Sequence, residues 1–566
     1  MANNDAKGLG SGLTNYGDPD FALYLRRSFA KSMGYTDEAL GKPIVGICYT
    51  ESGFNNCHRH FPELLEAVKR GVLANGALPI MFPVISLGEV FLQPTSMMFR
   101  NLMAMDVEEM IRAQPMDSVV LMGGCDKTVP ALLMGAISAN KPSVMLVGGA
   151  MMTGRHKGER LGACTDCRRF WSQYRAGKID GEEISQIEGR LAVTTGTCAV
   201  MGTASTMAII AEALGMTLPE TTAIPAVHAD RLRAAEETGK LAAQMTNNGK
   251  KPTEIISRQS IENALRLLLA VSGSTNAVIH LAAIAGRLGF SIDPDQFNSL
   301  SDETPVLVNL KPVGDGYMED FHEAGGVGAV MRELNGLLDP DAQDVTGQRL
   351  GDRLAKPPEV TRDDRYIKAR GNPVDPLGGL IILRGSLAPD GAVLKRAAAS
   401  PHLLEHEGRA IVFSSLEDLA ARIDAPDLDV TADDILVLQN AGPRSASAMP
   451  EAGYLPIPKK LAVRGVKDMV RISDARMSGT AFGTIVLHVT PEAATGGPLA
   501  RVRTGDRIRL SAKSKRIDLL VPEPELALRQ PVSSPATALR GYGKLYAQTV
   551  LPATQGCDFD FLAQSK

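Results

Sequence analysis

The chain contains 566 residues, with 60 Lys and Arg against 64 Asp and Glu and a formal net charge of −4. Its 44% hydrophobic and 22% charged residues are ordinary for globular proteins and exclude wholesale disorder, collagen-like repeats and a disulfide-stapled miniprotein. No excess positive charge is present to neutralise a phosphate backbone, and aromatic residues make up only 5%. We therefore expect a small polar molecule, and no nucleic acid, as the partner.

The sequence shows no export or membrane signal. Residues 1–17 are rich in Gly, Asn and Asp and lack the basic start and apolar core of a signal peptide. The uncharged run 191–211 is long enough to span a bilayer, but lipid would penalise its five Thr, one Ser and two Gly. The seven cysteines are few, odd in number and mostly far apart, unlike a secreted disulfide framework. We expect a cytoplasmic protein with no membrane partner.

Short apolar runs alternate with helical patterns from residue 42 to about 337, which is typical of βα units and a mainly parallel sheet. Four runs are apolar on both faces, as in buried parallel strands: 44–48, 79–85, 118–122 and 143–147. Helical patterns, for example 61–73 and 97–112, lie between them. The sequence predicts an α/β fold with an N-terminal α/β domain over residues 1–370.

The pattern changes after a charged, Pro-containing stretch at 337–376, which we interpret as a linker or long connection with a domain boundary near Asp375. Beyond it, short strand-like segments such as RAIVFSS, DILVLQ and TIVLHVT follow one another. We expect a β-rich barrel or sandwich, as a C-terminal domain over residues 376–566.

Three cysteines lie in loop-like stretches: Cys57 in GFNNCHRHF, Cys125 in MGGCDKTVP and Cys198 in TTGTCAVMGTASTM. Cys125 and Cys57 follow expected strands, so both should emerge at the carboxyl edge of the sheet, where open α/β folds bind ligands. Three thiolates could hold an iron–sulfur cluster and leave one iron incompletely ligated by protein. Free cysteine is also a common buried small residue, and this alternative stays open.

Charged side chains stand in similar loops. Asp126 and Lys127 come directly after Cys125, and Glu89 follows another expected strand in VISLGEVF. Carboxylates such as Asp126 and Glu89 suit Mg²⁺, although solvated loop charges would give the same pattern. Glu451 lies in MPEAGYLP of the C-terminal part.

Two hydroxyl-bearing residues and a cysteine pair are the remaining candidate site residues. Ser478 and Thr480 lie in the Gly-bounded stretch ISDARMSGTAFG, but G-x-S-x-G is absent, so hydrolase chemistry has no support and a plain turn serine is an alternative. Cys164 and Cys167 form a C-x-x-C pair without a second pair or a suitably spaced His to complete a zinc site. We expect core or solvent-side thiols there.

Five long motifs in chain order are far more specific than any single short pattern: GGCDKTVPALLMGA, GTCAVMGTASTMA, GSTNAVIHLAAIAGRLG, HEAGGVGAVMREL and ISDARMSGTAFGTIVLHVTPEAATGGPLA. Together they resemble the dihydroxyacid dehydratase and phosphogluconate dehydratase family over nearly the whole chain. GTCAVMGTASTMA and VKDMVRISDARMSGTAFG are most similar to its sugar-acid branch, especially pentonate (L-arabinonate-like) dehydratases. The resemblance implies an N-terminal α/β domain, a C-terminal β-barrel domain and hydro-lyase activity.

The resemblance also implies two cofactor sites, with ligands at matching motif positions. A 2Fe–2S cluster would be held by three cysteines: Cys57, Cys125 and Cys198. A Mg²⁺ site would be formed by four side chains: Glu89, Asp126, Lys127 and Glu451. The family lysine is carbamylated and so presents an oxygen ligand, since a free ammonium cannot bind a cation. Ser478 matches the serine taken as the general base, and Thr480 lies beside it as a candidate substrate contact.

The implied reaction is dehydration of a pentonate to a 2-keto-3-deoxy acid without redox change. Ser478, as an alkoxide, takes the C2 proton, while Mg²⁺ and the open iron act as Lewis acids. A branched-chain 2,3-dihydroxyacid dehydratase and a noncatalytic iron–sulfur sensor are the alternatives. PRSASAMPEAG is less Gly-rich than the branched-chain pattern, which indicates a different substrate pocket. We expect a homodimer or homotetramer.

Overall fold

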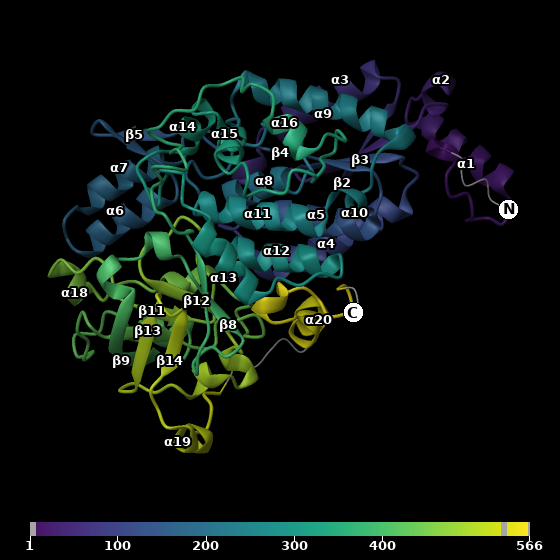
Figure 1. Ribbon diagram of the computed structural model, residues 1–566. Coiled ribbons are helices and arrows are strands. Elements are labelled where there is room, and N and C mark those ends of the chain that lie inside the picture. The colour runs from purple at the N-terminus through teal and green to yellow at the C-terminus, as the bar shows by residue number, and fades with distance from the viewer. Residues whose placement is uncertain (1–6, 534–539, 564–566) are drawn as a thin grey trace.

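Four buried runs rich in Val, Ile, Leu and Met form an entirely parallel sheet in the computed structural model, which describes residues 7–533 and 540–563 (Figure 1). The sheet order is β2-β1-β3-β4, with β1 (Ile44–Tyr49), β2 (Leu78–Pro83), β3 (Ser118–Gly123) and β4 (Ser143–Val147). β3 and β4 are buried along their whole length, which explains why these runs are apolar on both faces. The expected parallel sheet is confirmed, with ends shifted by one or two residues.

Helices cover both faces of this sheet. α3 (Phe61–Ala74) and α9 (Ala229–Asn248) pack on each other on one side, and α4 (Ser96–Ala113) and α5 (Thr128–Ala139) on the other (Figure 1). α3 and α9 approach closely because glycines face the contact. A Cβ on Gly71 would lie 2.0 Å from the carbonyl oxygen of Glu236.

The other elements before the C-terminal strands surround this core. Their bounds are α1 (Pro19–Ser32), α2 (Asp37–Leu40), β5 (Gly154–His156), β6 (Glu159–Leu161), α6 (Thr165–Arg175), α7 (Gly181–Leu191), α8 (Thr203–Ala213), α10 (Pro252–Ile255), α11 (Arg258–Ala270), α12 (Asn276–Arg287), α13 (Pro294–Glu303), α14 (Met318–Glu323), α15 (Gly326–Glu333) and α16 (Leu350–Leu354). Across residues 7–533 and 540–563, none of the helices combines the length and the apolar composition needed to cross a membrane.

The stretch 337–376, expected as a linker or a long connection, packs against the N-terminal part. It contains α16, and short bridges pair Val308 with Ile367 and Val306 with Asp375. Its charges and prolines therefore mark an ordered connection rather than a free tether.

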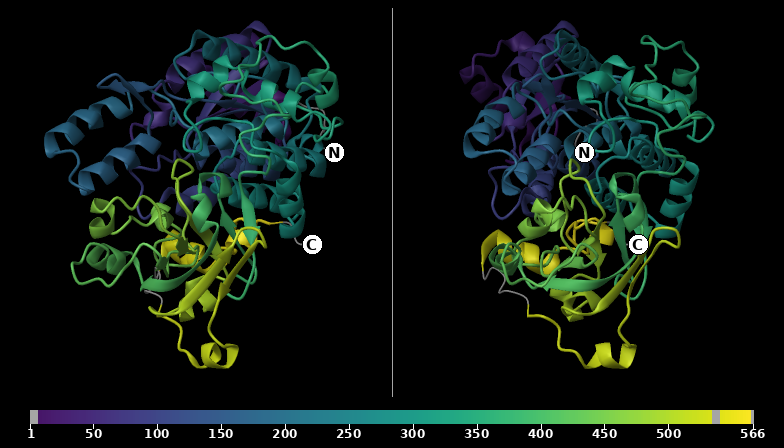
Figure 2. Two further views of the ribbon diagram at one scale, coloured as in Figure 1. Left: turned by 60° about the vertical axis from the view of Figure 1, so that its left-hand side comes forward. Right: turned by 90° about the vertical axis from the view of Figure 1, so that its left-hand side faces the viewer.

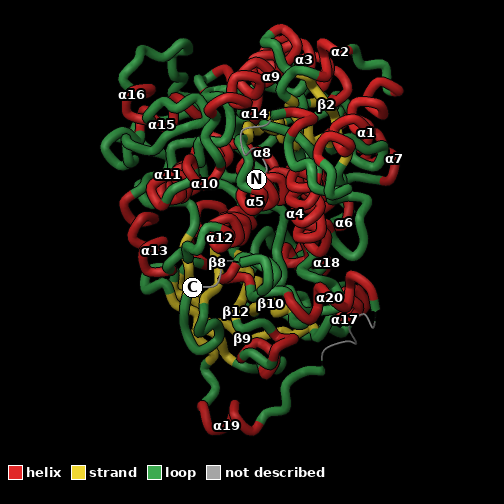
Figure 3. The backbone as a smooth tube through the Cα atoms, turned by 90° about the vertical axis from the view of Figure 1, so that its right-hand side faces the viewer, coloured by secondary structure: helices red, strands yellow, loops and turns green. Residues whose placement is uncertain are grey.

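The strands after this connection gather in one sheet at the lower end of the molecule (Figure 2, Figure 3). Its order is β14-β13-β9-β10-β11-β12-β8-β7. The bounds are β7 (Ile381–Leu383), β8 (Gly391–Leu394), β9 (Glu405–Phe413), β10 (Ile435–Leu438), β11 (Arg471–Ser473), β12 (Ile485–Thr490), β13 (Arg507–Ser511) and β14 (Arg516–Leu519). Arg384, next to β7, bridges to Arg516 of β14, so the sheet nearly closes on itself. The expected barrel-like architecture is confirmed.

Part of this barrel is parallel, unlike a simple run of hairpins. β9, β10, β11 and β12 are parallel neighbours, and the connections between the first three contain α17 (Leu416–Arg422) and α18 (Lys459–Val463). β11 has only three residues, and its short apolar signal in VRISDAR did not stand out in the sequence.

The end of the chain fastens the barrel to the N-terminal helices. After α19 (Glu523–Leu528) and α20 (Gly541–Thr549), Arg100 of α4 donates to the carbonyl oxygens of Gly556 and Cys557 at 2.7 and 2.9 Å. Arg287 of α12 lies 2.6 Å from Asp558, and both side chains are almost fully buried. Removing one partner of such a buried pair costs about 3–5 kcal/mol, so the two parts are held in a fixed orientation.

Candidate active site

Three carboxylates from distant parts of the chain meet beyond the carboxyl edge of the parallel sheet. Glu89 follows β2, Asp126 follows β3, and Glu451 begins a short 3-10 helix (Glu451–Tyr454) of the C-terminal part. Their oxygen atoms lie within 4.8 Å of one another. A set of three carboxylates fits a hard divalent cation such as Mg²⁺, which prefers oxygen ligands.

Lys127 lies at the same place. Its side chain is fully buried, and its Nζ lies 2.5 Å from Asp126 Oδ2 and 3.9 Å from Glu89 Oε2. Burial would raise the pKa of Asp126, but the positive charges of Lys127 and Arg476 outweigh it and hold that pKa below its usual value. The four side chains that the resemblance assigns to Mg²⁺ are therefore brought together.

Arg476 is a buried member of this cluster that sequence reasoning missed. Its guanidinium donates to Glu451 Oε1 and Glu89 Oε1, each at 2.6 Å. Each carboxylate has a second oxygen, and although that of Glu89 accepts from Ser96 Oγ, both second oxygens have lone pairs left for a cation while the first binds Arg476. The signal was present in the sequence, because Arg476 stands two residues before Ser478 in the motif ISDARMSGTAFG.

If this cluster binds Mg²⁺, Glu451→Gln should weaken the binding at least about tenfold, because the substitution removes one of its three carboxylates. Burial, together with the nearby Glu89 and Asp126 carboxylates, raises the pKa of Glu451 to about 7 against the opposing charge of Arg476. Below pH 7 the cation must displace a proton, so wild-type affinity should fall as the pH drops from 7 to 6. Calorimetric Mg²⁺ titrations at both pH values measure this, and the Glu451→Gln protein should lose that pH dependence. Equal affinities for variant and wild type would contradict the assignment.

The three sequence-predicted cysteines lie on loops beside the carboxylates. Cys125 follows β3 with φ of 60°, a strained conformation for a non-glycine residue that is often found at functional sites. Hydrogen bonding with Cys57 and burial raise the pKa of the Cys125 thiol well above its ordinary value. Hydrogen bonding with Cys164 and burial raise the pKa of the Cys198 thiol well above its ordinary value, and Cys57 adds to that rise. Cys125 Sγ also donates to Asp126 Oδ1 at 3.4 Å, so the thiol and carboxylate groups adjoin.

The C-x-x-C pair lies in the same cluster of thiols. Cys164 occupies the N-cap position of α6, and its Sγ lies 3.4 Å from Cys198 Sγ. Hydrogen bonds with Cys167 and Cys198 lower the pKa of the Cys164 thiol. Spacing alone gave no sign that this pair approaches the predicted cluster ligands.

Ser478 lies on the loop between β11 and β12, which reaches up to the N-terminal part. Its Oγ is 2.8 Å from Thr480 Oγ1, so one hydroxyl donates to the other. Gly479, between them, packs so closely that a Cβ there would lie 2.6 Å from the Cβ of Ser274. The Gly479 N–H donates to Thr203 Oγ1 at 3.3 Å. This close contact holds the loop against the amino-terminal end of α8.

Arg168 of α6 is a second residue that sequence reasoning missed. Its Nη1 donates to Thr480 Oγ1 at 2.9 Å, and its guanidinium lies over the Tyr454 ring at 5.5 Å. Thr165 Oγ1 donates to the Thr480 carbonyl oxygen at 3.0 Å. α6 thus connects the cysteine cluster, at the start of the helix, to the Ser478 loop. It also lets the Arg168 guanidinium hydrogen-bond to Thr480, which in turn hydrogen-bonds to Ser478.

Lys395 is a buried lysine under the same loop. Its Nζ donates to the Gly479 carbonyl oxygen at 3.4 Å, and no carboxylate of the described residues forms an ion pair with it. Burial lowers the pKa of Lys395 to about 7. An unfolded lysine titrates near ~10.4, so unfolding at pH 7 takes up about half a proton, and Lys395 destabilises the fold by about 4 kcal/mol at that pH.

Lys395→Met should therefore raise the free energy of unfolding at pH 7 by about 3 kcal/mol, after about 1 kcal/mol is subtracted for the lost hydrogen bond. The gain should vanish as the pH rises to 10, because the folded lysine is then neutral and the remaining cost of burying it, under about 1 kcal/mol, is offset by the hydrogen bond that methionine lacks. Activity should fall because the Ser478 loop loses an anchor. Urea unfolding at pH 7 and 10 measures the first effect, with exposed Lys513→Met as the control. A variant less stable than wild type at pH 7 would contradict it.

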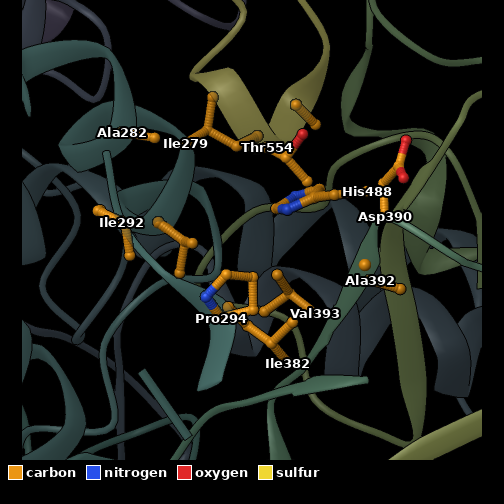
Figure 4. Close-up of a pocket in the computed structure, with 13 residues that line it drawn as sticks. Ile279, Ala282, Ile292, Pro294, Ile382, Asp390, Ala392, Val393, His488 and Thr554 are labelled. Atoms are coloured by element: carbon orange, nitrogen blue, oxygen red, sulfur yellow. The ribbon is translucent and has the colours of Figure 1, made fainter. Parts of the chain in front are cut away.

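A mainly apolar cavity lies elsewhere, between α12 and strands β8 and β12 (Figure 4). It contains none of the sequence-predicted site residues. His488 lines it with neither ring nitrogen hydrogen-bonded, and burial lowers its pKa to about 3, so the ring is neutral. Asp390 is the charged residue in its lining, and none of the described residues that line it is a Lys or Arg, so the cavity lacks the positive charge that would bind a sugar acid.

Comparisons with known proteins identify the family of the chain. The family description "Dihydroxy-acid/6-phosphogluconate dehydratase N-terminal" matches residues 42–353, and its C-terminal counterpart matches residues 365–557. The chain is 46% identical to an L-arabonate dehydratase of Azospirillum brasilense, over 97% of this chain and 96% of the relative. A 6-deoxy-6-sulfo-D-gluconate dehydratase of Pseudomonas putida is 45% identical over 93% and 91%. A dihydroxy-acid dehydratase of Agathobacter rectalis is 38% identical over 94% and 95%. The chain belongs to the dihydroxy-acid/6-phosphogluconate dehydratase family and is a hydro-lyase.

Proposed function

We propose that the protein dehydrates a sugar acid of the pentonate class, such as L-arabinonate, to the 2-keto-3-deoxy acid. The observation that carries the proposal is the meeting of three groups on loops from both parts of the chain: the carboxylate cluster, the cysteine cluster and Ser478. The higher identity to relatives named for sugar acids than to one named for a dihydroxy acid supports a sugar acid as the substrate, and the L-arabonate dehydratase among them is the reason for choosing a pentonate.

Ser478 is the proposed general base that removes the proton from C2 of the substrate. A serine hydroxyl is ordinarily too weak a base, so nearby positive charge has to stabilise its alkoxide. Arg168 supplies such charge through Thr480, whose hydroxyl can donate to Ser478 while it accepts from the guanidinium. Thr480 thereby orients Ser478 and stands where it can contact the substrate.

The residues present fit both groups that the family implies. The 2Fe–2S cluster would be held by the thiols of Cys57, Cys125 and Cys198. The Cys125 thiol lies beside Asp126. The Mg²⁺ ligands would be Glu89, Asp126, Glu451 and a carbamylated Lys127. When bound, Mg²⁺ would stabilise the negative charge that develops at the substrate carboxylate, and the cluster would supply a Lewis acid for departure of the C3 hydroxyl.

An anaerobic activity screen tests the proposal. Protein reconstituted with iron, sulfide and Mg²⁺ is offered pentonates, hexonates and 2,3-dihydroxy-3-methylbutanoate, and 2-keto acid formation is measured. The expected result is a kcat/KM at least tenfold higher for one pentonate than for the branched acid. A higher kcat/KM for the branched acid would indicate a branched-chain dihydroxyacid dehydratase. No 2-keto acid from any substrate, with the cluster loaded, would favour a noncatalytic sensor.

We also propose a cytoplasmic homodimer or homotetramer. All seven cysteines are free, as expected in a reducing compartment. Several large apolar side chains on or beside α1 are 46–69% exposed: Tyr16, Phe21, Tyr24, Phe29 and Met33. An apolar helix face of this kind suits a second copy of the chain. Light scattering should give two or four chains per particle, and Phe29→Glu should lower that number; a wild-type monomer would overturn the proposal.

A further inference from the structure

We propose that Cys164 is a fourth thiol ligand of the cluster and binds the incompletely ligated iron in the substrate-free enzyme. The inference rests on the proposed function, because it presupposes a 2Fe–2S cluster at Cys57, Cys125 and Cys198. The structure contributes a sulfur atom that the family motifs do not assign, at the place where those three cysteines converge. No electron transfer is involved, since a thiol ligand only has to give way to the substrate.

The distance between Cys164 and Cys198 suits two ligands of one iron. Their Sγ atoms lie 3.4 Å apart, far beyond the ~2.05 Å of a disulfide bond. Two thiolates on one tetrahedral metal with bonds of about 2.3 Å lie about 3.7 Å apart, so a small adjustment would accommodate the metal.

The thiols also fall into two pairs. Cys57 interacts with Cys125, and Cys164 interacts with Cys198 as well as with its neighbour Cys167. A 2Fe–2S cluster with four cysteine ligands needs two thiolates at each of its two irons. The pairing in the structure therefore matches complete ligation, whereas three cysteines alone leave one position open.

The position of Cys164 is fixed by the backbone on either side of it. The Ala199 N–H donates to the Ala163 carbonyl oxygen at 3.1 Å, which ties the Cys164 loop to the Cys198 loop at adjacent residues. Asp166 accepts from the Gly162 N–H at 2.8 Å and from Lys311 Nζ at 3.0 Å.

The electrostatics at Cys164 suit an anionic sulfur ligand. Cys164 occupies the N-cap position of α6, an 11-residue helix whose amino-terminal end carries partial positive charge. Cys167 lies one turn further along the chain and hydrogen-bonds to Cys164. It is a half-buried thiol on the same helix and serves as the matched control.

Four anaerobically reconstituted proteins test the proposal: wild type, Cys164→Ser, Cys167→Ser and Cys57→Ser. Iron, sulfide, the visible spectrum and the EPR spectrum of the reduced cluster are measured, followed by the rate at which EDTA removes the cluster. Cys164→Ser should keep its iron but show a shifted spectrum and lose the cluster at least fivefold faster than wild type. Cys167→Ser should match wild type, and Cys57→Ser should fail to assemble the cluster.

A measurement on the wild type makes the test independent of variant folding. Iodoacetamide should label Cys164 in the apoprotein and at least tenfold more slowly in the cluster-loaded protein, while Cys167 should react similarly in both. Equal labelling of Cys164 in the two forms, a Cys164–Cys167 disulfide in the loaded protein, or a Cys164→Ser spectrum and EDTA rate like those of wild type would each overturn this inference alone. A wild type that assembles no cluster would overturn the proposed cofactor and this inference together.

Discussion

Ser478→Ala should lower kcat for sugar-acid dehydration about 10³-fold, the middle of the range for loss of a general base. The substitution removes the Oγ atom that would take the C2 proton, whereas the carboxylate and cysteine clusters lie on other residues. Iron content, Mg²⁺ affinity and the melting temperature should therefore stay at wild-type values. The measurement is steady-state kinetics on the best substrate of the screen, with the cofactor content of each preparation determined.

Thr480→Val is the control that separates the base from its neighbour. It keeps Ser478 but removes the hydroxyl that links Ser478 to Arg168. Without that link the Ser478 alkoxide is less stabilised, so its pKa rises and the ascending limb of kcat/KM should move to higher pH. We expect a loss of about tenfold at pH 7, smaller than for Ser478→Ala. A fully active Ser478→Ala protein would show that another group takes the proton.

The parallel sheet could be predicted because its strands carry an unambiguous signal. β3 and β4 are buried on both faces, so every position is apolar and the runs stand out between helical patterns. The rule that ligands bind at the carboxyl edge of such a sheet then pointed to Cys125 and Asp126, which directly follow β3.

The meeting of the two parts of the chain could not be predicted from local patterns. Arg476 contacts Glu89 across 387 residues of sequence, and that contact depends on how the barrel docks on the N-terminal helices. Motif resemblance supplied Glu451 and Ser478 but not Arg168 or Cys164, because their contacts follow from the position of α6. β11 was missed because three residues give too short a pattern to distinguish a strand.

Cys125→Ala should abolish cluster assembly and with it the dehydratase activity. Cys125 is buried next to the carboxylates, and no other thiol of the described residues follows β3 to replace it. Alanine meets the same backbone strain as cysteine at φ of 60°, so the change adds no conformational cost of its own. Loss of a small buried side-chain atom costs about 1 kcal/mol, which a chain of this size tolerates.

The expected result for Cys125→Ala is a colourless protein with less than about a tenth of the wild-type iron and activity below detection. Cys48→Ala is the matched control, since Cys48 is a fully buried cysteine on β1 and should keep both iron and activity. Asp126 remains in the variant, so Mg²⁺ should still bind with an affinity within a few-fold of wild type. Retention of the cluster would exclude Cys125 as a ligand, whereas loss of Mg²⁺ binding together with the iron would show that the two sites assemble only as a unit.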